Sequence, residues 1–579
     1  MGVPGFFLWL WKKYKKTNFV FSKGKIDDED LNNKINSLDY LLIDANCLIH
    51  PTCFKVLADN PDFKDQDNLE NKMMNAVLDY IDKLINYVDP KKGIYLAIDG
   101  VAPTAKIKQQ RYRRFKSYHD KVMFDNIKVK HNKVVNKNWN NSAITPGTEF
   151  MEKLHYKILE WCKKSKRKII YSSCKTPSEG EHKLLQFIRD NIKEKLEHSY
   201  VMYGLDADLI FLCLSTKSPN MFLLREATEF DKKSHKEDLN YVSIDIMKEL
   251  IIDSMEEIAT TDDTKGDIID KKNYNNVISD FIFICYLLGN DFLPHMPALD
   301  IYGNGLDIIL EKYIELIGNY GYDKFIVESN KKPSNINMKL FTEFISYLAS
   351  EESETLKNIY ASSKKHYKCN STDPYDIELH RIDNIYFKVD DPILLGSDES
   401  ELWKKRYYNF HFNLNEDEYS NYVEKLVKEY IIGLKWVTNY YFDGCPSWDW
   451  YYPFNYPPFL EDIRDFLVKE KSFNVNKHKF NYGSPLKPFN QLLLVLPPQS
   501  SYLIPKELRK IVHNPNSSLA YLYPTQIKQD FIGKHKYWMA QPLLPSFDIN
   551  HVRRIYRKYE DGIPNDVLNR NKKLKIFTF

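Results

Sequence analysis

The first half of the chain alternates short apolar segments with longer amphipathic ones, and no other feature limits the fold as strongly. The short segments are rich in β-branched and aromatic residues and predict strands at 40–43, 94–98, 168–172 and 200–203. Helical patterns separate them, as the crossovers between parallel strands require. The alternation therefore predicts an α/β fold with a parallel, doubly wound sheet and helices on both faces.

Carboxylates stand where these apolar segments end. Seven of them follow a predicted strand or apolar run, or open the helix after a strand: Asp44, Asp99, Glu179, Glu181, Asp206, Asp208 and Asp291. The carboxyl ends of parallel strands share one sheet edge, where ligands bind, so we expect these side chains to converge there. Clustered carboxylates need a compensating cation, and oxygen ligands favour Mg²⁺ or Mn²⁺. Two such ions about 4 Å apart suit an in-line phosphodiester displacement.

Each carboxylate also has a purely structural explanation. An aspartate after a strand often only forms a turn. Ser178 and Glu181 have the spacing of a capping box, in which the glutamate would stabilise the start of its helix. The set as a whole favours catalysis, because random placement of turns would rarely put acidic residues at the ends of five apolar segments.

A basic segment, 106–116, follows Asp99 after a short turn. Its polar residues recur at positions i, i+4, i+7 and i+8, which places them on one helical face: Lys106, Gln110, Arg113 and Arg114. Such a face suits a terminal phosphate, which arginine can bind through two hydrogen bonds. A solvated helix is the commoner explanation of a charge run. The position next to a candidate metal ligand favours phosphate binding.

Composition narrows the functional classes. The 579 residues are 43% hydrophobic and 28% charged, which supports a sizeable core and excludes collagen-like and wholly disordered chains. The net charge is only +3, so nucleic-acid binding would need locally concentrated positive charge. The eight cysteines form no C-x-x-C pair and no apolar run reaches membrane-spanning length. We expect reduced thiols in a cytosolic protein that does not bind membranes.

These residues, in this order, closely resemble the XRN family of 5′→3′ exoribonucleases. The resemblance covers nearly the whole chain and includes LLIDANCLIH, IYLAIDGVAPTAKIKQQRYRRF, PSEGEHK, YGLDADLIFLCLST, GNDFLPHMP and GLKWVTNYYFDGCPSWDWYYPFNYPPF. It implies a PIN/flap-nuclease-like catalytic core with a parallel or mixed sheet, and a helical, aromatic- and proline-rich second region packed on it. We therefore divide the chain into a catalytic region (1–325), a variable connector (326–400) and a second conserved region that completes the active-site pocket (401–579).

The resemblance also implies roles for single residues. Asp44, Asp99, Glu179 and Glu181 would surround one Mg²⁺ or Mn²⁺, and Asp206, Asp208 and Asp291 would surround the second. Lys106, Gln110, Arg113 and Arg114 would receive the 5′-monophosphate. His50 would stack on the terminal nucleotide, opposite a tryptophan of the second region. The sequence leaves Trp448 and Trp450 both open for that position.

The activity implied is processive degradation of single-stranded RNA with a 5′-monophosphate to nucleoside 5′-monophosphates, by two-metal-ion hydrolysis. The interval between Asp208 and Asp291 lacks a C-x-x-C pair, and this makes the cytoplasmic, mRNA-decay branch the better match. We expect a minimal, monomeric form without the family's C-terminal extension, acting in the cytoplasm, or in the host cytoplasm if the source is a virus. Its decapping or RNA-decay partners are not identified by the sequence.

Two other functions stay open. A flap-type structure-specific nuclease would share the acidic sheet edge, and residues 301–309 faintly resemble its helix–hairpin–helix. The CPSWDWYY segment has no place in that class. A non-catalytic RNA-binding scaffold is the second alternative, but an unused cluster of seven carboxylates would be costly to hold together. From about residue 401, abundant prolines also predict irregular structure packed onto the first part.

Overall fold

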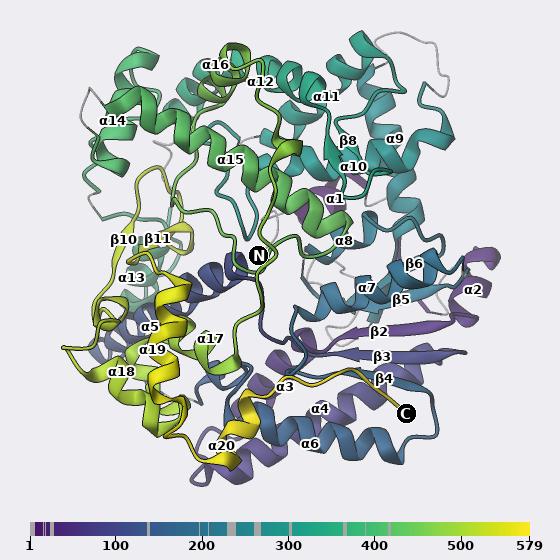
Figure 1. The fold of residues 1–579 in the computed structure, drawn as a ribbon, viewed down its shortest axis with the longest axis vertical. Coiled ribbons are helices and arrows are strands. Elements are labelled where there is room, and N and C mark those ends of the chain that lie inside the picture. The colour runs from purple at the N-terminus through teal and green to yellow at the C-terminus, as the bar shows by residue number, and fades with distance from the viewer. Residues whose placement is uncertain are drawn as a thin grey trace.

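The computed structural model describes residues 6–14, 17, 19–23, 28–135, 139–195, 197–206, 208–227, 239–259, 268–299, 304–362, 368–387, 389–414 and 418–579. Within these ranges the largest sheet has eight strands in the order β1-β7-β6-β5-β2-β3-β4-β12 (Figure 1). Their bounds are β1 Val20–Ser22, β2 Tyr40–Asp44, β3 Gly93–Ala97, β4 Ile169–Ser172, β5 Tyr200–Tyr203, β6 Met221–Glu226, β7 Leu239–Ser243 and β12 Phe577–Thr578.

The centre of this sheet is parallel and its edges are antiparallel. Strands β6, β5, β2, β3 and β4 run parallel, with Leu42 opposite both Tyr95 and Met202. Strands β1 and β7 complete one edge, and β12 closes the other, with Phe577 opposite Tyr171. The four predicted strands and the mixed α/β architecture are confirmed, whereas β1, β6, β7 and β12 were not predicted.

Helices cover both faces of the sheet, because successive strand residues point to opposite sides. Leu41 and Ile43 pack with α3 (Ala45–Asp59), α4 (Gln66–Val88) and α6 (Glu149–Lys164). Leu42 faces the other side and joins a larger cluster with the helices α7 (Gly180–Lys193), α8 (Asp208–Leu214), α9 (Ile244–Ala259), α10 (Tyr274–Cys285) and α11 (Gly305–Tyr320). Figure 1 shows α4 and α6 along one side of the sheet and α7 along the other.

The second half of the chain extends that larger cluster. It contributes α12 (Met338–Ser362), α14 (Ser400–Phe412), α15 (Tyr419–Phe442) and α16 (Leu460–Lys469). The prediction of irregular structure holds for 443–459 but is wrong for α15, because 418–442 contains no proline. Further elements are α1 Phe6–Tyr14, α2 Glu29–Asn36, α13 Pro374–Asp383, α17 Pro488–Val495, α18 Arg509–His513, α19 Ile549–Glu560, α20 Asn565–Leu568, β8 Val327–Glu328, β9 Asn335–Ile336, β10 Lys528–Asp530 and β11 Gln541–Leu543.

The long helix α5 (Thr104–Lys130) joins the two halves of the molecule. It packs against α17 and β11. Its fully buried Arg111 donates hydrogen bonds to the carbonyls of Leu494 (2.7 Å) and Leu522 (2.5 Å). Lys108 donates to the carbonyls of Tyr452 and Phe454. Residues far apart in sequence therefore hold α5 in place, and only residues 98–103 separate its first turn from strand β3.

None of the eight cysteines forms a disulfide. Among the helices in the described ranges, none combines the length and the apolar character needed to cross a membrane.

Candidate active site

The carboxyl ends of the parallel strands carry most of the predicted acidic residues. Asp44 is the last residue of β2, and Asp99 follows β3 by two residues. Asp206 lies three residues after β5, and Asp208 begins α8. Asp291 does not follow a strand. The apolar run before it forms the end of α10 and a 3₁₀ turn at Tyr286–Leu288 rather than a strand.

Helix α7 brings two glutamates to the same edge. Glu179 is its N-cap residue and makes no side-chain capping bond, while Ser178 has a left-handed backbone with φ of 101°. The capping-box explanation of Ser178 and Glu181 is therefore wrong, since the helix starts one residue later than that motif requires. Glu181, in the first turn, is buried.

Gly180 allows two of the aspartates to approach the start of α7. Its backbone N–H donates to Asp99 Oδ1 at 2.6 Å. A Cβ atom at this position would lie 2.7 Å from Asp44 Oδ1 and 3.3 Å from Asp99 Oδ1. Any side chain here would enter the space between the two carboxylates, so glycine is required for the close approach.

Burial and mutual repulsion raise the pKa values of several of these carboxyls. Burial and then the neighbouring Asp99 raise the pKa of Asp44 to about 7. Burial and then Asp291 raise the pKa of Asp208 to about 7. The pKa of Glu181 is also raised, by burial and by Glu179, although Lys106 opposes the shift. The ionised cluster is therefore costly unless cations compensate it.

Lys106 supplies one such cation. Its Nζ atom lies 2.5 Å from Glu179 Oε2 and 2.7 Å from Asp291 Oδ2. Burial alone would lower the pKa of Lys106, but Asp291 and Glu179 raise it well above its ordinary value. In return, and against the effect of burial, Lys106 holds the pKa of Asp291 below its ordinary range. One ammonium group cannot balance seven carboxylates.

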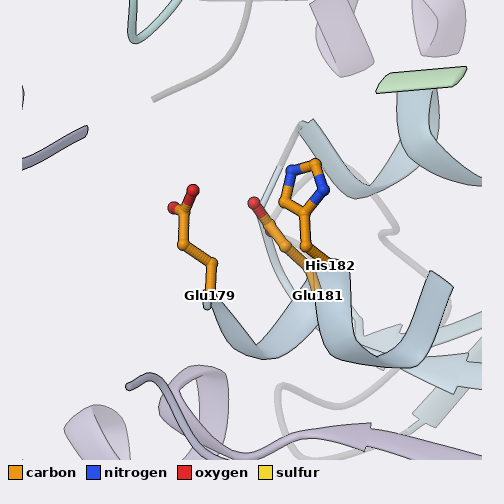
Figure 2. A group of neighbouring side chains, drawn as sticks. All are labelled: Glu179, Glu181 and His182. Atoms are coloured by element: carbon orange, nitrogen blue, oxygen red, sulfur yellow. The ribbon is translucent and has the colours of Figure 1, made fainter. Parts of the chain in front are cut away.

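The donor set fits a hard divalent cation. Asp44 Oδ1 is buried and accepts no hydrogen bond, while Oδ2 accepts one from Cys47 Sγ at 3.1 Å. The converging ligand atoms are carboxylate oxygens, which Mg²⁺ and Mn²⁺ prefer. Glu179, Glu181 and His182 have ligand atoms within 4.8 Å of one another, and Figure 2 shows the three side chains at the start of α7.

Two residues at this site were missed from the sequence. His182 lies beside Glu181 in the PSEGEHK motif and is buried, with its ring stacked on Tyr440 at 3.7 Å. Tyr440 comes from α15 and donates its hydroxyl to Glu179 Oε1 at 2.7 Å. The position of the histidine directly after Glu181 could have indicated it, whereas nothing in the sequence near Tyr440 marks it as a neighbour of Glu179.

The four residues of α5 that were predicted to bind the terminal phosphate have different environments. Lys106 reaches the carboxylates, whereas Gln110 is buried and accepts a hydrogen bond from Gln491 Nε2 at 3.1 Å. Arg114 donates to Thr145 Oγ1 at 2.6 Å, and Arg113 is exposed. His50 lies near both arginines: burial, followed by Arg113 and Arg114, lowers the pKa of His50 to about 4.

The two candidate tryptophans differ in how they are held. Trp450 stacks on Trp436 with ring centroids 5.2 Å apart, and it packs against the large hydrophobic cluster. Trp448 belongs to none of the three hydrophobic clusters formed by the described residues. Its backbone carbonyl accepts hydrogen bonds from the N–H and Oγ1 of Thr104, at the first turn of α5.

Comparison with known proteins identifies relatives over the whole length. 5′-3′ exoribonuclease 2 of Candida albicans is 28% identical, over 100% of this chain and 74% of that protein. The Arabidopsis thaliana protein of the same name is 27% identical, over 99% and 69%. 5′-3′ exoribonuclease 1 of Homo sapiens is 29% identical, over 99% and 35%. These near-equal identities do not assign the chain to either branch.

A solved structure of the catalytic core of Rad2 in complex with DNA substrate matches 82% of this chain and 97% of that chain. It has 12% identity and a TM-score of 0.28, too low to support an argument about the fold. The family comparison is stronger. A profile described as "XRN 5'-3' exonuclease N-terminus" matches residues 1–227, and one described as "Xrn1 helical domain" matches 271–384 and 387–578. The chain therefore belongs to the XRN family of 5′→3′ exoribonucleases.

Proposed function

We propose that this chain is a processive 5′→3′ exoribonuclease that degrades 5′-monophosphorylated single-stranded RNA to nucleoside 5′-monophosphates by two-metal-ion hydrolysis. One observation carries the proposal. The acidic sheet edge and the basic helix α5 meet at Lys106, whose ammonium group contacts Glu179 and Asp291. A site that holds divalent cations and a site that holds a terminal phosphate would thus be adjacent.

The acidic cluster fits the metal dependence of this family. Asp44, Asp99, Glu179 and Glu181 would hold one Mg²⁺ or Mn²⁺, and Asp206, Asp208 and Asp291 the second. When bound, the two ions would lower the pKa of an attacking water and stabilise charge on the leaving oxygen. The buried, unpartnered Oδ1 of Asp44 supports this assignment, because an orphaned carboxylate oxygen in the protein interior is costly.

The 5′ end would be held by groups from α5 and its neighbours. Arg113 and Arg114 would bind the terminal phosphate with Lys106 and Gln110, and this pocket would have no room for a cap or a triphosphate. His50 would stack on the first base. Its lowered pKa keeps the ring neutral at pH 7, so it does not repel the two arginines. Stacking tolerates every base, which suits degradation without sequence preference.

We propose further that residues 401–579 complete this pocket, that 1–325 form the catalytic region and that 326–400 connect them. The hydrogen bonds from Thr104 to Trp448 support a pocket shared by the first and second regions. We also propose that the protein acts as a monomer in the cytoplasm, in mRNA decay. The lack of a C-x-x-C pair between Asp208 and Asp291 supports the cytoplasmic assignment.

The test compares matched RNAs of one sequence that carry a 5′-monophosphate, a 5′-hydroxyl, a 5′-triphosphate or a cap, with a DNA flap as the rival substrate. We expect Mg²⁺-dependent release of mononucleotides from the monophosphate RNA and little from the others. Asp208→Asn provides the inactive control. Cleavage of the flap at its junction would support the flap-nuclease alternative, and binding of RNA without product would support the scaffold.

A further inference from the structure

The two carboxylate oxygens of Glu179 have different partners. Oε1 accepts a hydrogen bond from the hydroxyl of Tyr440 at 2.7 Å, and Oε2 lies 2.5 Å from Lys106 Nζ. Tyr440 and Glu179 are both buried, with 1% and 4% of their surface exposed. The hydroxyl bond therefore forms where water cannot easily replace it, and loss of the hydroxyl would leave Oε1 without this donor.

Tyr440 is fixed by aromatic rings on both faces. His182 stacks on one side with centroids 3.7 Å apart and an interplanar angle of 28°. Trp436 stacks at 4.7 Å and 27°, and Trp450 stacks on Trp436 at 5.2 Å and 24°. Phe292, next to Asp291, meets the edge of the Tyr440 ring at 5.4 Å. This row of rings runs from α7 into the second region and leaves the tyrosine little freedom to move.

Lys106 and Tyr440 differ in how they hold Glu179. The lysine has a long flexible stem, and its ammonium group is shared between Glu179 and Asp291. The tyrosine is packed between rings and touches only one of the two oxygens. A cation that displaces the ammonium group from Oε2 would leave the hydroxyl bond to Oε1 intact.

We propose that Tyr440 is a positioning residue that fixes Oε1 of Glu179, so that Oε2 is the oxygen presented to a divalent cation. The proposal rests on the metal-binding role of Glu179 proposed above. In this proposal the second region contributes to the metal site as well as to the proposed substrate pocket. Outer-shell partners of metal ligands typically contribute 10- to 100-fold to metal affinity.

Tyr440→Phe tests the proposal directly, because it removes the hydroxyl and keeps the ring between His182 and Trp436. We would titrate the RNA-free protein with Mn²⁺ and measure free Mn²⁺ by electron paramagnetic resonance. The apparent dissociation constant of the weakened site should rise about 10- to 100-fold. In a parallel assay, turnover of RNA should need correspondingly more Mn²⁺ but should return to within about threefold of wild type at saturation.

Tyr407→Phe is the matched control. The hydroxyl of Tyr407 donates to the carbonyl of Pro457 at 2.9 Å rather than to a carboxylate, and the residue is buried in α14. It should bind Mn²⁺ within twofold of wild type. Affinity of Tyr440→Phe within twofold of wild type, or an equal loss in both variants, would overturn the proposal.

The titration also separates this inference from the proposed activity. It uses no RNA, so an enzyme that fails to degrade 5′-monophosphate RNA but shows the Tyr440 effect would contradict only the proposed substrate. An active exonuclease whose Tyr440→Phe variant binds Mn²⁺ normally would contradict only the positioning role.

Discussion

The Nζ atom of Lys106 lies 2.7 Å from Oδ2 of Asp291, so an ion pair joins the basic helix α5 to the acidic sheet edge. The sequence suggested two separate functions for these residues, phosphate binding and metal binding. The contact makes them adjacent and competitive. A divalent cation bound by Asp291 would compete with the ammonium group for the same oxygen.

The first prediction follows from that competition. Lys106→Met removes the cation and leaves Glu179 and Asp291 buried without it, and loss of one partner of a buried ion pair typically costs about 3–5 kcal/mol. In EDTA the variant should unfold at a lower temperature than wild type. Added Mg²⁺ should raise its unfolding temperature by more than it raises that of wild type, because the ion no longer has to displace the lysine.

Lys116→Met is the control for this experiment. Lys116 lies on the same helix with the same side-chain exposure, 13%, but pairs with Asp120 outside the carboxylate cluster. Its response to Mg²⁺ should match that of wild type. An equal Mg²⁺ response in Lys106→Met and wild type would contradict the competition.

The second prediction concerns pH. The folded-state pKa values of Asp44 and Asp208 are raised to about 7, above their ordinary value of about 3.9. Their protonated forms therefore stabilise the folded state: the contribution is complete below about pH 4 and is lost as the pH rises through about 7. In EDTA the unfolding temperature should fall between pH 5 and pH 8, whereas Mg²⁺ should stabilise more at high pH.

Other groups must be separated from this effect. Burial also raises the pKa values of Asp280 to about 7 and of Glu352 to about 8. Their contribution to the stability of the folded state is therefore also lost as the pH rises. The Asp44→Asn/Asp208→Asn double variant isolates the contribution of the acidic cluster. Its unfolding temperature in EDTA should depend less on pH than that of wild type, and an unchanged dependence would contradict the assignment.

The third prediction concerns hydrolysis. Asp206→Ala or Asp208→Ala should abolish release of nucleotides while RNA binding stays largely intact, because other groups hold the strand. Single-turnover assays and fluorescence anisotropy would measure the two properties. Turnover above a tenth of the wild-type value at saturating Mg²⁺ would show that the substituted aspartate is not required.

The fourth prediction concerns selection of the 5′ end. Arg113 is exposed and lies near His50, so Arg113→Ala should weaken binding of a 5′-phosphate without disturbing the core. A hydrogen bond to a charged group is worth about 1.5–3 kcal/mol, so kcat/KM on 5′-monophosphate RNA should fall roughly 10- to 150-fold. The rate on 5′-hydroxyl RNA should hardly change. Lys121→Ala, on the same helix, should leave both rates as they are.

The fifth prediction separates the two tryptophans. Trp448 is held by its backbone beside Thr104, and we expect its ring and that of His50 to hold the first base. Trp448→Ala and His50→Ala should therefore lose processivity. Loss of a base stack worth about 1–3 kcal/mol should slow turnover roughly 5- to 150-fold. Trp450→Ala should instead lower stability, because its ring packs on Trp436. Product lengths under single-hit conditions and thermal unfolding would measure the two effects. Equal loss of processivity in both tryptophan variants would contradict this division.

Some of the site was accessible from the sequence because its cause is local. An apolar, β-branched segment of four or five residues is stable as a buried strand, and an aspartate after it lies at the sheet edge whatever the rest of the chain does. Asp44 and Asp99 follow this rule. The spacing of Lys106 and Arg113 likewise needed only helical geometry.

Other features depend on contacts between distant residues. The apolar run before Asp291 is a helix, and periodicity cannot distinguish a short buried helix from a strand. Strand β12 has two residues and exists only because β4 offers it an edge. The spacing placed four residues on one face of α5 but could not give their partners: Lys106 contacts Glu179, and Gln110 accepts a hydrogen bond from Gln491.

The sequence by itself thus determined the family, the strand-end carboxylates and the basic helix, because local propensity and residue spacing encode them. Only the tertiary structure decided which oxygen of Glu179 meets Lys106 and which meets Tyr440. It also decided that Trp450 stacks on Trp436 and that Trp448 lies beside Thr104. The reason is physical: Glu179 and Tyr440 are 261 residues apart in the sequence, and their contact forms only where α15 packs against α7.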